Sequence, residues 1–202
     1  MIVTRLSEVS ASRVKVYIDE QSAFVLYKGE LRKYGLREGE PIEEKIYEEL
    51  VCEVLPKRAK LRCMNLIKSR DYTREQLKLK LKQGGYPEQV IEEALDYAAS
   101  ERYIDDLRYA ESFIVCSHER KSRRRIENDL LQKGISAETI ASAWMQWESE
   151  GNVQDEEEQI KALLVKKHFD VETADRKELQ KMYVFLARKG FDGDKIRRML
   201  LK

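Results

Sequence analysis

The residues best suited to catalysis or metal binding are few and widely spaced in this chain. Asp105 and Asp106 are an adjacent carboxylate pair that could hold a metal ion or exchange a proton. However, adjacent residues on a helix project about 100° apart, and no third ligand accompanies them. We therefore expect one of the two to cap the helix that follows.

The thiols and imidazoles do not form a site either. Cys52, Cys63 and Cys116 are odd in number and lack a CxxC spacing, and His118 and His168 stand apart from them. This pattern disfavours a disulfide framework and a zinc site. Phosphate-binding glycine loops and hydrolase motifs are also missing from the sequence. We predict a non-enzyme with no catalytic residue, metal or cofactor, and with reduced thiols.

Basic residues offer a different chemistry, the binding of phosphates or carboxylates. The net charge is only +1, but residues 57–82 hold ten Lys or Arg and two Asp or Glu. Like charges four residues apart share a helix face and repel by a few tenths of a kcal/mol per pair. An anionic partner would relieve that repulsion, and an ordinary solvated face is the alternative. The candidate binding residues in this region are Lys57, Arg58, Arg62, Arg74, Lys78 and Lys82.

A second basic cluster falls where a helix should begin. The helix dipole disfavours cations at that end by about 0.3–1 kcal/mol each, which indicates partner binding. The alternative is salt bridges to residues 136–158, which hold seven acidic residues and no basic ones. Residues 159–202 are basic again, with twelve Lys or Arg against six acids. These regions add the candidates Arg120, Lys121, Arg123, Arg124, Arg125, Arg197 and Arg198.

The elements that must position these residues are mainly helical. Charged residues make up 37% of the chain, and it contains nine Gly and three Pro, a composition typical of helices. The N-terminus differs, because Val14, Val16 and Ile18 alternate with polar residues at strand period. Together with a second strand at residues 24–27, this alternation predicts a β-hairpin. Residues 2–3 are a candidate for a third strand.

Helical periodicity begins at Pro41, a residue suited to a first helical position. An apolar stripe then continues to Val54, and we expect Pro56 to end this first helix. A second helix should cover about residues 57–69. Thr73 and Gln76 have the spacing of a capping box and predict the start of a third helix.

Three segments superpose on Gly85, Gly134 and Gly190, which are 49 and 56 residues apart. Apolar residues recur eight and four positions before each glycine, and one, six and ten positions after it. The register predicts a helix, a left-handed glycine cap and a second helix. Its members are Leu77, Leu81, Tyr86, Ile91 and Leu95, then Ile126, Leu130, Ile135, Ile140 and Trp144, then Met182, Leu186, Phe191, Ile196 and Leu200.

An additional helix precedes each pair, at about residues 57–69, 106–118 and 154–168. The predicted fold is therefore mostly α, an elongated array of tandem three-helix repeats with a small N-terminal β-hairpin. We expect a hairpin region at 1–40, a connecting helix at 41–56, and repeats at 57–105, 106–151 and 152–202. Such arrays expose long faces suited to binding extended partners.

These segments also carry a family resemblance. The run of residues 103–114, YIDDLRYAESFI, resembles the central signature of the RecX family, as do residues 123–126 with 130–135. The C-terminal residues 185–191 and 196–200 resemble it too, and the likeness covers roughly residues 42–202. Arg102 and Leu107 depart from it, since a glycine and a polar residue are common at those positions.

The resemblance implies a regulator that binds the RecA recombinase and usually limits the growth or activity of the RecA filament on single-stranded DNA. It also implies that the tandem three-helix repeats form a curved body. The alternative is a helical repeat protein that binds nucleic acid directly, without RecA. A helix-turn-helix reader needs a basic second helix, which the first two repeats lack. We further expect a cytoplasmic monomer, because no apolar run approaches the roughly 18 residues of a membrane span.

Overall fold

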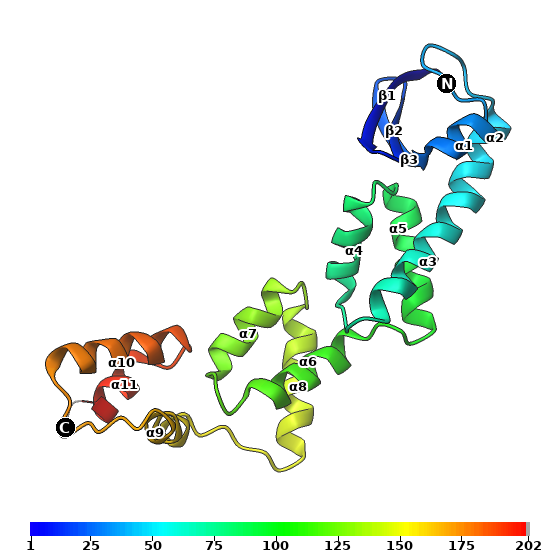
Figure 1. Cartoon of the computed structure of the whole chain (residues 1–202). Coiled ribbons are helices and arrows are strands. Elements are labelled where there is room, and N and C mark those ends of the chain that lie inside the picture. The colour runs from blue at the N-terminus through cyan, green and yellow to red at the C-terminus, as the bar shows by residue number, and fades with distance from the viewer. Residues whose placement is uncertain (201–202) are drawn as a thin grey trace. The chain divides into compact units, whose positions relative to one another are not determined.

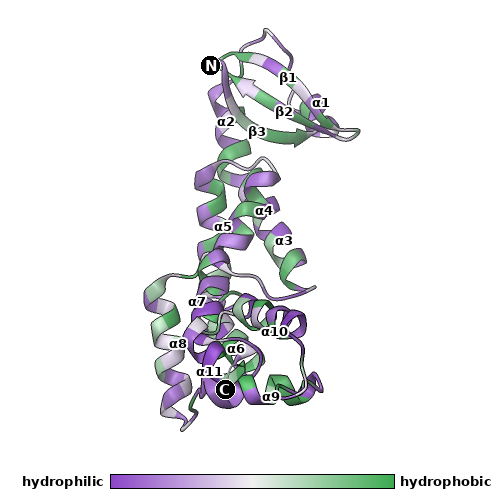
Figure 2. Cartoon of the chain, turned by 90° about the vertical axis from the view of Figure 1, so that its left-hand side faces the viewer, coloured by the Kyte–Doolittle hydropathy of each residue, from purple (hydrophilic) through white to green (hydrophobic). Residues whose placement is uncertain are grey.

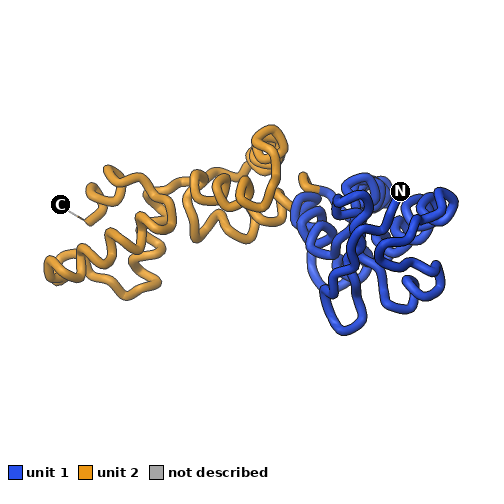
Figure 3. Tube along the Cα trace, turned by 90° about the horizontal axis from the view of Figure 1, so that it is seen from above, with its two compact units in different colours: residues 1–105 blue, residues 106–202 orange. Residues whose placement is uncertain are grey.

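The computed structural model describes residues 1–200. The chain divides into two compact units, residues 1–105 and residues 106–202 (Figure 3). The helices and strands of each unit pack mainly on one another.

The first unit opens with a three-stranded antiparallel sheet in the order β1-β2-β3, where we predicted a hairpin. Val14, Val16 and Ile18 of β2 are buried, as their alternation predicted. The first strand extends well past residues 2–3, and two register shifts in its pairing with β2 interrupt its alternation. The strands are β1 (Val3–Ser10), β2 (Arg13–Ile18) and β3 (Gln21–Tyr27).

Two predicted helix boundaries, a start at Pro41 and an end at Pro56, are wrong. Pro41 does not begin a helix but lies in a β-bridge with Ile2, and after the short helix α1 (Lys28–Lys33) the next helix, α2 (Glu44–Glu49), begins later. Pro56 does not end a helix, because α2 continues through the π-helical turn η1 (Leu50–Val54) into α3 (Leu55–Ile67). A proline lacks the N–H donor and its ring crowds the carbonyl four residues back. The wider π turn just before Pro56 is a place where a helix accommodates such an interruption.

The remaining helices follow the predicted pattern of three repeats (Figure 1). Polar and apolar residues alternate along their ribbons (Figure 2), as expected of helices that bury one face. The first repeat comprises α3, α4 (Arg74–Gln83) and α5 (Glu88–Ser100); the second α6 (Asp106–Ser117), α7 (Arg123–Gln132) and α8 (Ala137–Ser149); the third α9 (Glu156–Lys166), α10 (Arg176–Arg188) and α11 (Gly193–Leu200).

The repeat register is confirmed. Gly85, Gly134 and Gly190 have φ of +80°, +83° and +88°, the left-handed conformation expected after a helix. Every apolar register position is buried except Tyr86, which is partly exposed. The capping box is also present: the Thr73 hydroxyl accepts from the Gln76 N–H at 3.2 Å, and the Gln76 side chain accepts from the Thr73 N–H at 3.3 Å.

The buried side chains form three hydrophobic clusters. The second and third repeats each have a cluster of their own. The sheet and the first repeat share a single cluster, in which Phe24 and Leu26 of β3 pack with residues such as Leu55 of α3. The sheet is therefore fixed to the first repeat.

Candidate partner-binding surfaces

The basic face predicted on α4 is compensated within the protein. The Arg74 guanidinium lies 2.7 Å from both Glu92 and Asp96. The Lys78 ammonium lies 2.6 Å from Glu88 and 2.5 Å from Glu92, and hydrogen bonds to these two carboxylates raise the Lys78 pKa. Acids of α5 thus relieve the repulsion for which the sequence suggested a partner.

The other candidates of residues 57–82 do not form one surface with them. Arg58 is mostly buried: it pairs with Glu30 and donates to the Val25 carbonyl at 3.3 Å, so it joins α3 to the sheet. Lys57 lies 3.5 Å from Glu53 in a highly exposed pair. Arg62 and Lys82 are exposed and have no carboxylate partner within the part of the chain that the structure describes.

The arginine cluster lies at a helix start, as predicted. Helix α7 begins at Arg123, and the hydroxyl of its N-cap Ser122 accepts from the Arg125 N–H at 3.2 Å. Arg123 pairs with Glu127 at 2.9 Å and with Glu148 at 2.6 Å, so the predicted link to the acid-rich segment is also present. The Arg123 guanidinium also lies 4.7 Å from the Trp144 ring centroid.

The neighbouring cations divide into paired and unpaired groups. Lys121 and Arg125 lie 2.7 Å and 3.0 Å from Asp129, whose side chain is only 12% exposed. Arg120 and Arg124 are exposed, and neither has a carboxylate partner among residues 1–200. In the third repeat, Arg197 lies 3.2 Å from Asp194 and Arg198 lies 3.4 Å from Glu157, both in exposed pairs.

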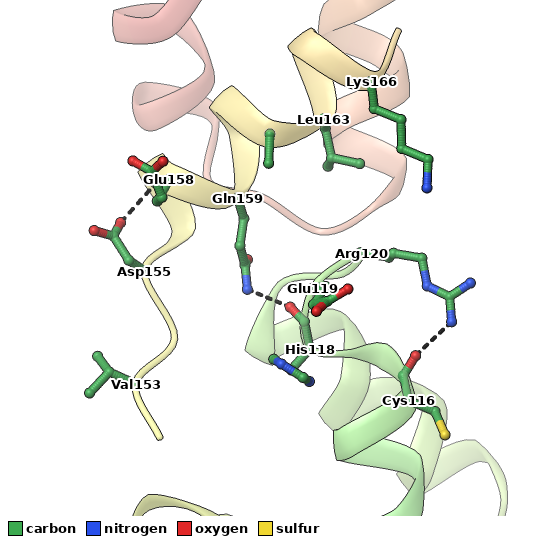
Figure 4. Close-up of a pocket in the computed structure, with 11 residues that line it drawn as sticks. Cys116, His118, Glu119, Arg120, Val153, Asp155, Glu158, Gln159, Leu163 and Lys166 are labelled. Atoms are coloured by element: carbon green, nitrogen blue, oxygen red, sulfur yellow. Dashed lines mark hydrogen bonds between the residues drawn. The ribbon is translucent and has the colours of Figure 1, made fainter. Parts of the chain in front are cut away.

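The turn between α6 and α7 receives contacts from the third repeat. The Ser122 N–H donates to the Lys189 carbonyl at 3.1 Å. The Gln154 amide donates to the carbonyls of His118 at 3.2 Å and Lys121 at 2.9 Å, and Gln159 also donates to His118 (Figure 4). These hydrogen bonds, one between backbone groups and three from glutamine side chains to backbone carbonyls, hold the second and third repeats together within the second unit.

This junction gathers five cations, which we call the junction cluster: Arg120, Lys121, Lys166, Lys167 and Lys189. Burial lowers the Lys189 pKa, and the positive charges of the other four lower it further. The ammonium groups of Lys167 and Lys189 lie 5.0 Å and 5.1 Å from the Phe185 ring centroid. Arg120 and Lys121 were predicted from the sequence, but the three lysines were missed, because their only signal was the basic excess of residues 159–202.

A groove of about 610 Å³ lies beside the cluster, between the α6–α7 turn and α9 (Figure 4). Its lining mixes two cations, Arg120 and Lys166, with three carboxylates, Glu119, Asp155 and Glu158, so the groove itself does not favour an anion. The structure contains no metal-binding group of three or more His, Cys, Asp or Glu within residues 1–200.

His118 and the tryptophans have packing roles. The His118 ring lies 5.2 Å from Trp147, which meets Trp144 edge-on at 5.4 Å. Both tryptophans are buried, which confirms Trp144 as a core residue and shows that Trp147 packs inside the repeat.

Within the described residues, no helix is both long and apolar enough to span a membrane.

Comparison with known proteins gives matches along the whole chain. Models of the first, second and third RecX three-helix domains match residues 59–97, 105–143 and 155–200, and the sheet precedes all three. The regulatory protein RecX of Caldanaerobacter subterraneus is 30% identical over 99% of this chain and 98% of its own length. That of Clostridioides difficile is 27% identical over 100% and 95%. A crystal structure of a regulatory protein RecX covers 98% of both chains at 25% identity, with a TM-score of 0.58. The chain belongs to the RecX family.

Proposed function

We propose that this chain binds the RecA recombinase and its filament on single-stranded DNA, and thereby inhibits recombinase activity. Two arguments support the proposal: the RecX resemblance implies this partner, and the relatives are named regulatory proteins. The observation that carries it is the junction cluster, in which four cations act on Lys189 and two of the ammonium groups, those of Lys167 and Lys189, share the Phe185 ring. Among the described residues the five cations have a single carboxylate partner, Asp129, which is bound to Lys121. We further propose that the chain acts in the cytoplasm as a monomer and without catalysis.

The cluster suits an anionic partner because its repulsion persists in the folded chain. The Lys189 pKa is lowered, so the charged form of Lys189 is less stable there than in water. A phosphate or carboxylate placed among these cations would reverse that effect. A filament on DNA offers both groups, since its strand carries one phosphate per nucleotide.

The test is the single-stranded-DNA-dependent ATPase of RecA, measured with increasing amounts of the purified chain. We compare Lys189→Glu with Lys177→Glu. Lys177 is exposed near the other end of α10, about 18 Å away at 1.5 Å per residue. We expect the parent chain and Lys177→Glu to inhibit alike, and Lys189→Glu to need at least about ten times more protein, the effect of losing one charge-assisted contact.

Folding provides the second readout. Lys189→Glu removes a cation from among like charges, so its urea midpoint should equal or exceed that of the parent chain. A lower midpoint would identify the cluster as part of the fold. If the parent chain, folded by circular dichroism, changed neither the ATPase nor strand exchange by RecA, the proposal would be wrong.

The alternative is direct action on nucleic acid without RecA. It requires that the chain alone reproduce the regulatory effect by covering the DNA, with a steep dependence of affinity on salt, about 0.7 in logarithmic slope per phosphate on a single strand. Inhibition of RecA at chain concentrations far below those that cover the DNA would exclude this alternative.

A further inference from the structure

The first unit contains a cleft that none of the sequence motifs predicted. It has a volume of about 470 Å³ and lies where the sheet meets α3 and the turn between α4 and α5. Figure 1 shows this turn beside the sheet, and the Val25 N–H donates to the Gly85 carbonyl at 3.1 Å. The long side chains that line it are Arg13, Tyr27, Arg58, Arg62, Lys80 and Tyr86.

The cleft is held in a fixed shape. Its two walls share one hydrophobic cluster. Arg58, which bonds to Glu30 and to the Val25 carbonyl, ties α3 to both α1 and β3. A Cβ added to Gly85 would clash with the Val25 side chain, so the turn and strand are in tight contact. A ligand would therefore enter a site that is already formed, which limits the entropy lost on binding.

The charge of the cleft is positive and largely uncompensated. Four of its ten lining residues are Lys or Arg, and none is acidic. Glu30 neutralises Arg58, but Arg13, Arg62 and Lys80 have no carboxylate partner in the described part of the chain. On the α4–α5 surface of the same repeat, by contrast, Arg74 and Lys78 are paired with acids.

Two tyrosine rings accompany these cations. Tyr27 is 45% exposed, and the Arg58 guanidinium lies 4.9 Å from its ring centroid. Tyr86 occupies the register position that follows the glycine. The equivalent Ile135 and Phe191 are buried in their own repeats, whereas Tyr86 is partly exposed and lines the cleft. Burial raises the pKa of the Tyr86 hydroxyl above its ordinary value.

We propose that this cleft binds a nucleotide of single-stranded nucleic acid, with its phosphates on Arg13, Arg62 and Lys80 and its base against the tyrosines. The combination of a basic groove and aromatic rings is the usual chemistry of single-strand binding. A duplex presents no free base face to a tyrosine, and an acidic peptide would use the cations but not the rings. The activity belongs to the chain alone and does not depend on the proposed RecA contact.

The test uses a fluorescently labelled twenty-nucleotide oligo-dT and the full-length chain, with binding measured by anisotropy at several salt concentrations. We expect Arg62→Glu to weaken binding about ten- to a hundredfold and to reduce the logarithmic salt slope by about 0.7. Lys68→Glu is the matched control, because Lys68 is exposed at the C-cap of the same helix, has no carboxylate partner among the described residues and does not line the cleft. It should change the affinity by less than about threefold.

The aromatic contribution is tested with Tyr27→Ala and Tyr27→Phe. Alanine should weaken binding about five- to a hundredfold, the range of one base–aromatic stack, and phenylalanine should restore it. Lys80→Glu provides a second charge variant if Arg62→Glu does not fold. RecA ATPase inhibition, measured on the same variants, separates failure of this inference from failure of the proposed function.

Three results would overturn the inference. Equal losses for Arg62→Glu and Lys68→Glu would indicate diffuse attraction to a basic surface. Unchanged binding by Tyr27→Ala would remove the stacking contact. Competition by a poly-glutamate peptide as effective as that of unlabelled oligo-dT would identify the cleft as a site for acidic protein.

Discussion

The contact between the third repeat and the α6–α7 turn leads to a quantitative prediction for Gly190→Ala. At φ +88° an alanine costs about 1–2 kcal/mol. Its Cβ would also lie 2.6 Å from both the Arg125 Cβ and the Ser122 hydroxyl, so the start of α7 must move. That movement weakens the Ser122 cap, about 0.5–2 kcal/mol, and the Ser122–Lys189 backbone hydrogen bond, about 0.5–1.5 kcal/mol. The expected loss of unfolding free energy is about 2–5 kcal/mol.

Gly151→Ala is the matched control for this substitution. Gly151 has nearly the same backbone conformation, with φ +85°, but no atom lies within 4 Å of an added Cβ. Only the backbone term applies, so we expect a loss of about 1–2 kcal/mol. Urea unfolding would be followed by circular dichroism for all helices and by fluorescence of Trp144 and Trp147 for the second repeat.

The difference between the two variants is the informative quantity. Equal losses would show that the close approach of Gly190 to α7 contributes nothing to stability. The Gly190 contact would then have no role in holding the second and third repeats together, and the bonds from Gln154 and Gln159 would remain as the link between them. The same measurement bears on function, because Lys189 of the junction cluster directly precedes Gly190.

Two further predictions concern the first repeat. Burial raises the Cys63 pKa from 9.0 to about 11. The unfolded state therefore releases the Cys63 proton at a lower pH than the folded state, and the free energy of unfolding should fall as the pH rises from about 9 to 11. Cys63→Ala should flatten that decline in urea titrations, and Ellman's reagent at pH 8 should modify the exposed Cys52 and Cys116 well before Cys63; equal rates for all three thiols would refute the burial. Arg58→Ala should lower the free energy of unfolding by about 1–3 kcal/mol, because it breaks a mostly buried ion pair. Lys57→Ala should lower it by under about 0.5 kcal/mol, because its ion pair is exposed. Similar shifts in melting temperature for the two variants would contradict the burial of the Arg58 pair.

Much of the fold follows from local patterns in the sequence. The Thr73 capping box, the left-handed glycines and the alternation of Val14, Val16 and Ile18 each depend on residues that are near neighbours in the chain. The error at Pro41 arose because a contact with a residue distant in the chain, the β-bridge to Ile2, prevailed over the local rule. The error at Pro56 arose because the π turn directly before it lets the helix continue through the proline.

Three helical repeats and their apolar register could be predicted from the chain alone, because helix periodicity and capping act over four residues or fewer. Which basic residues are left without a carboxylate partner, and so could bind another molecule, could not be predicted in this way. Arg74 is neutralised by Asp96 on the next helix, whereas Arg120 approaches Lys189, 69 positions away in the numbering. Charge compensation depends on distances of a few ångströms in space, and those distances are set by how the helices pack.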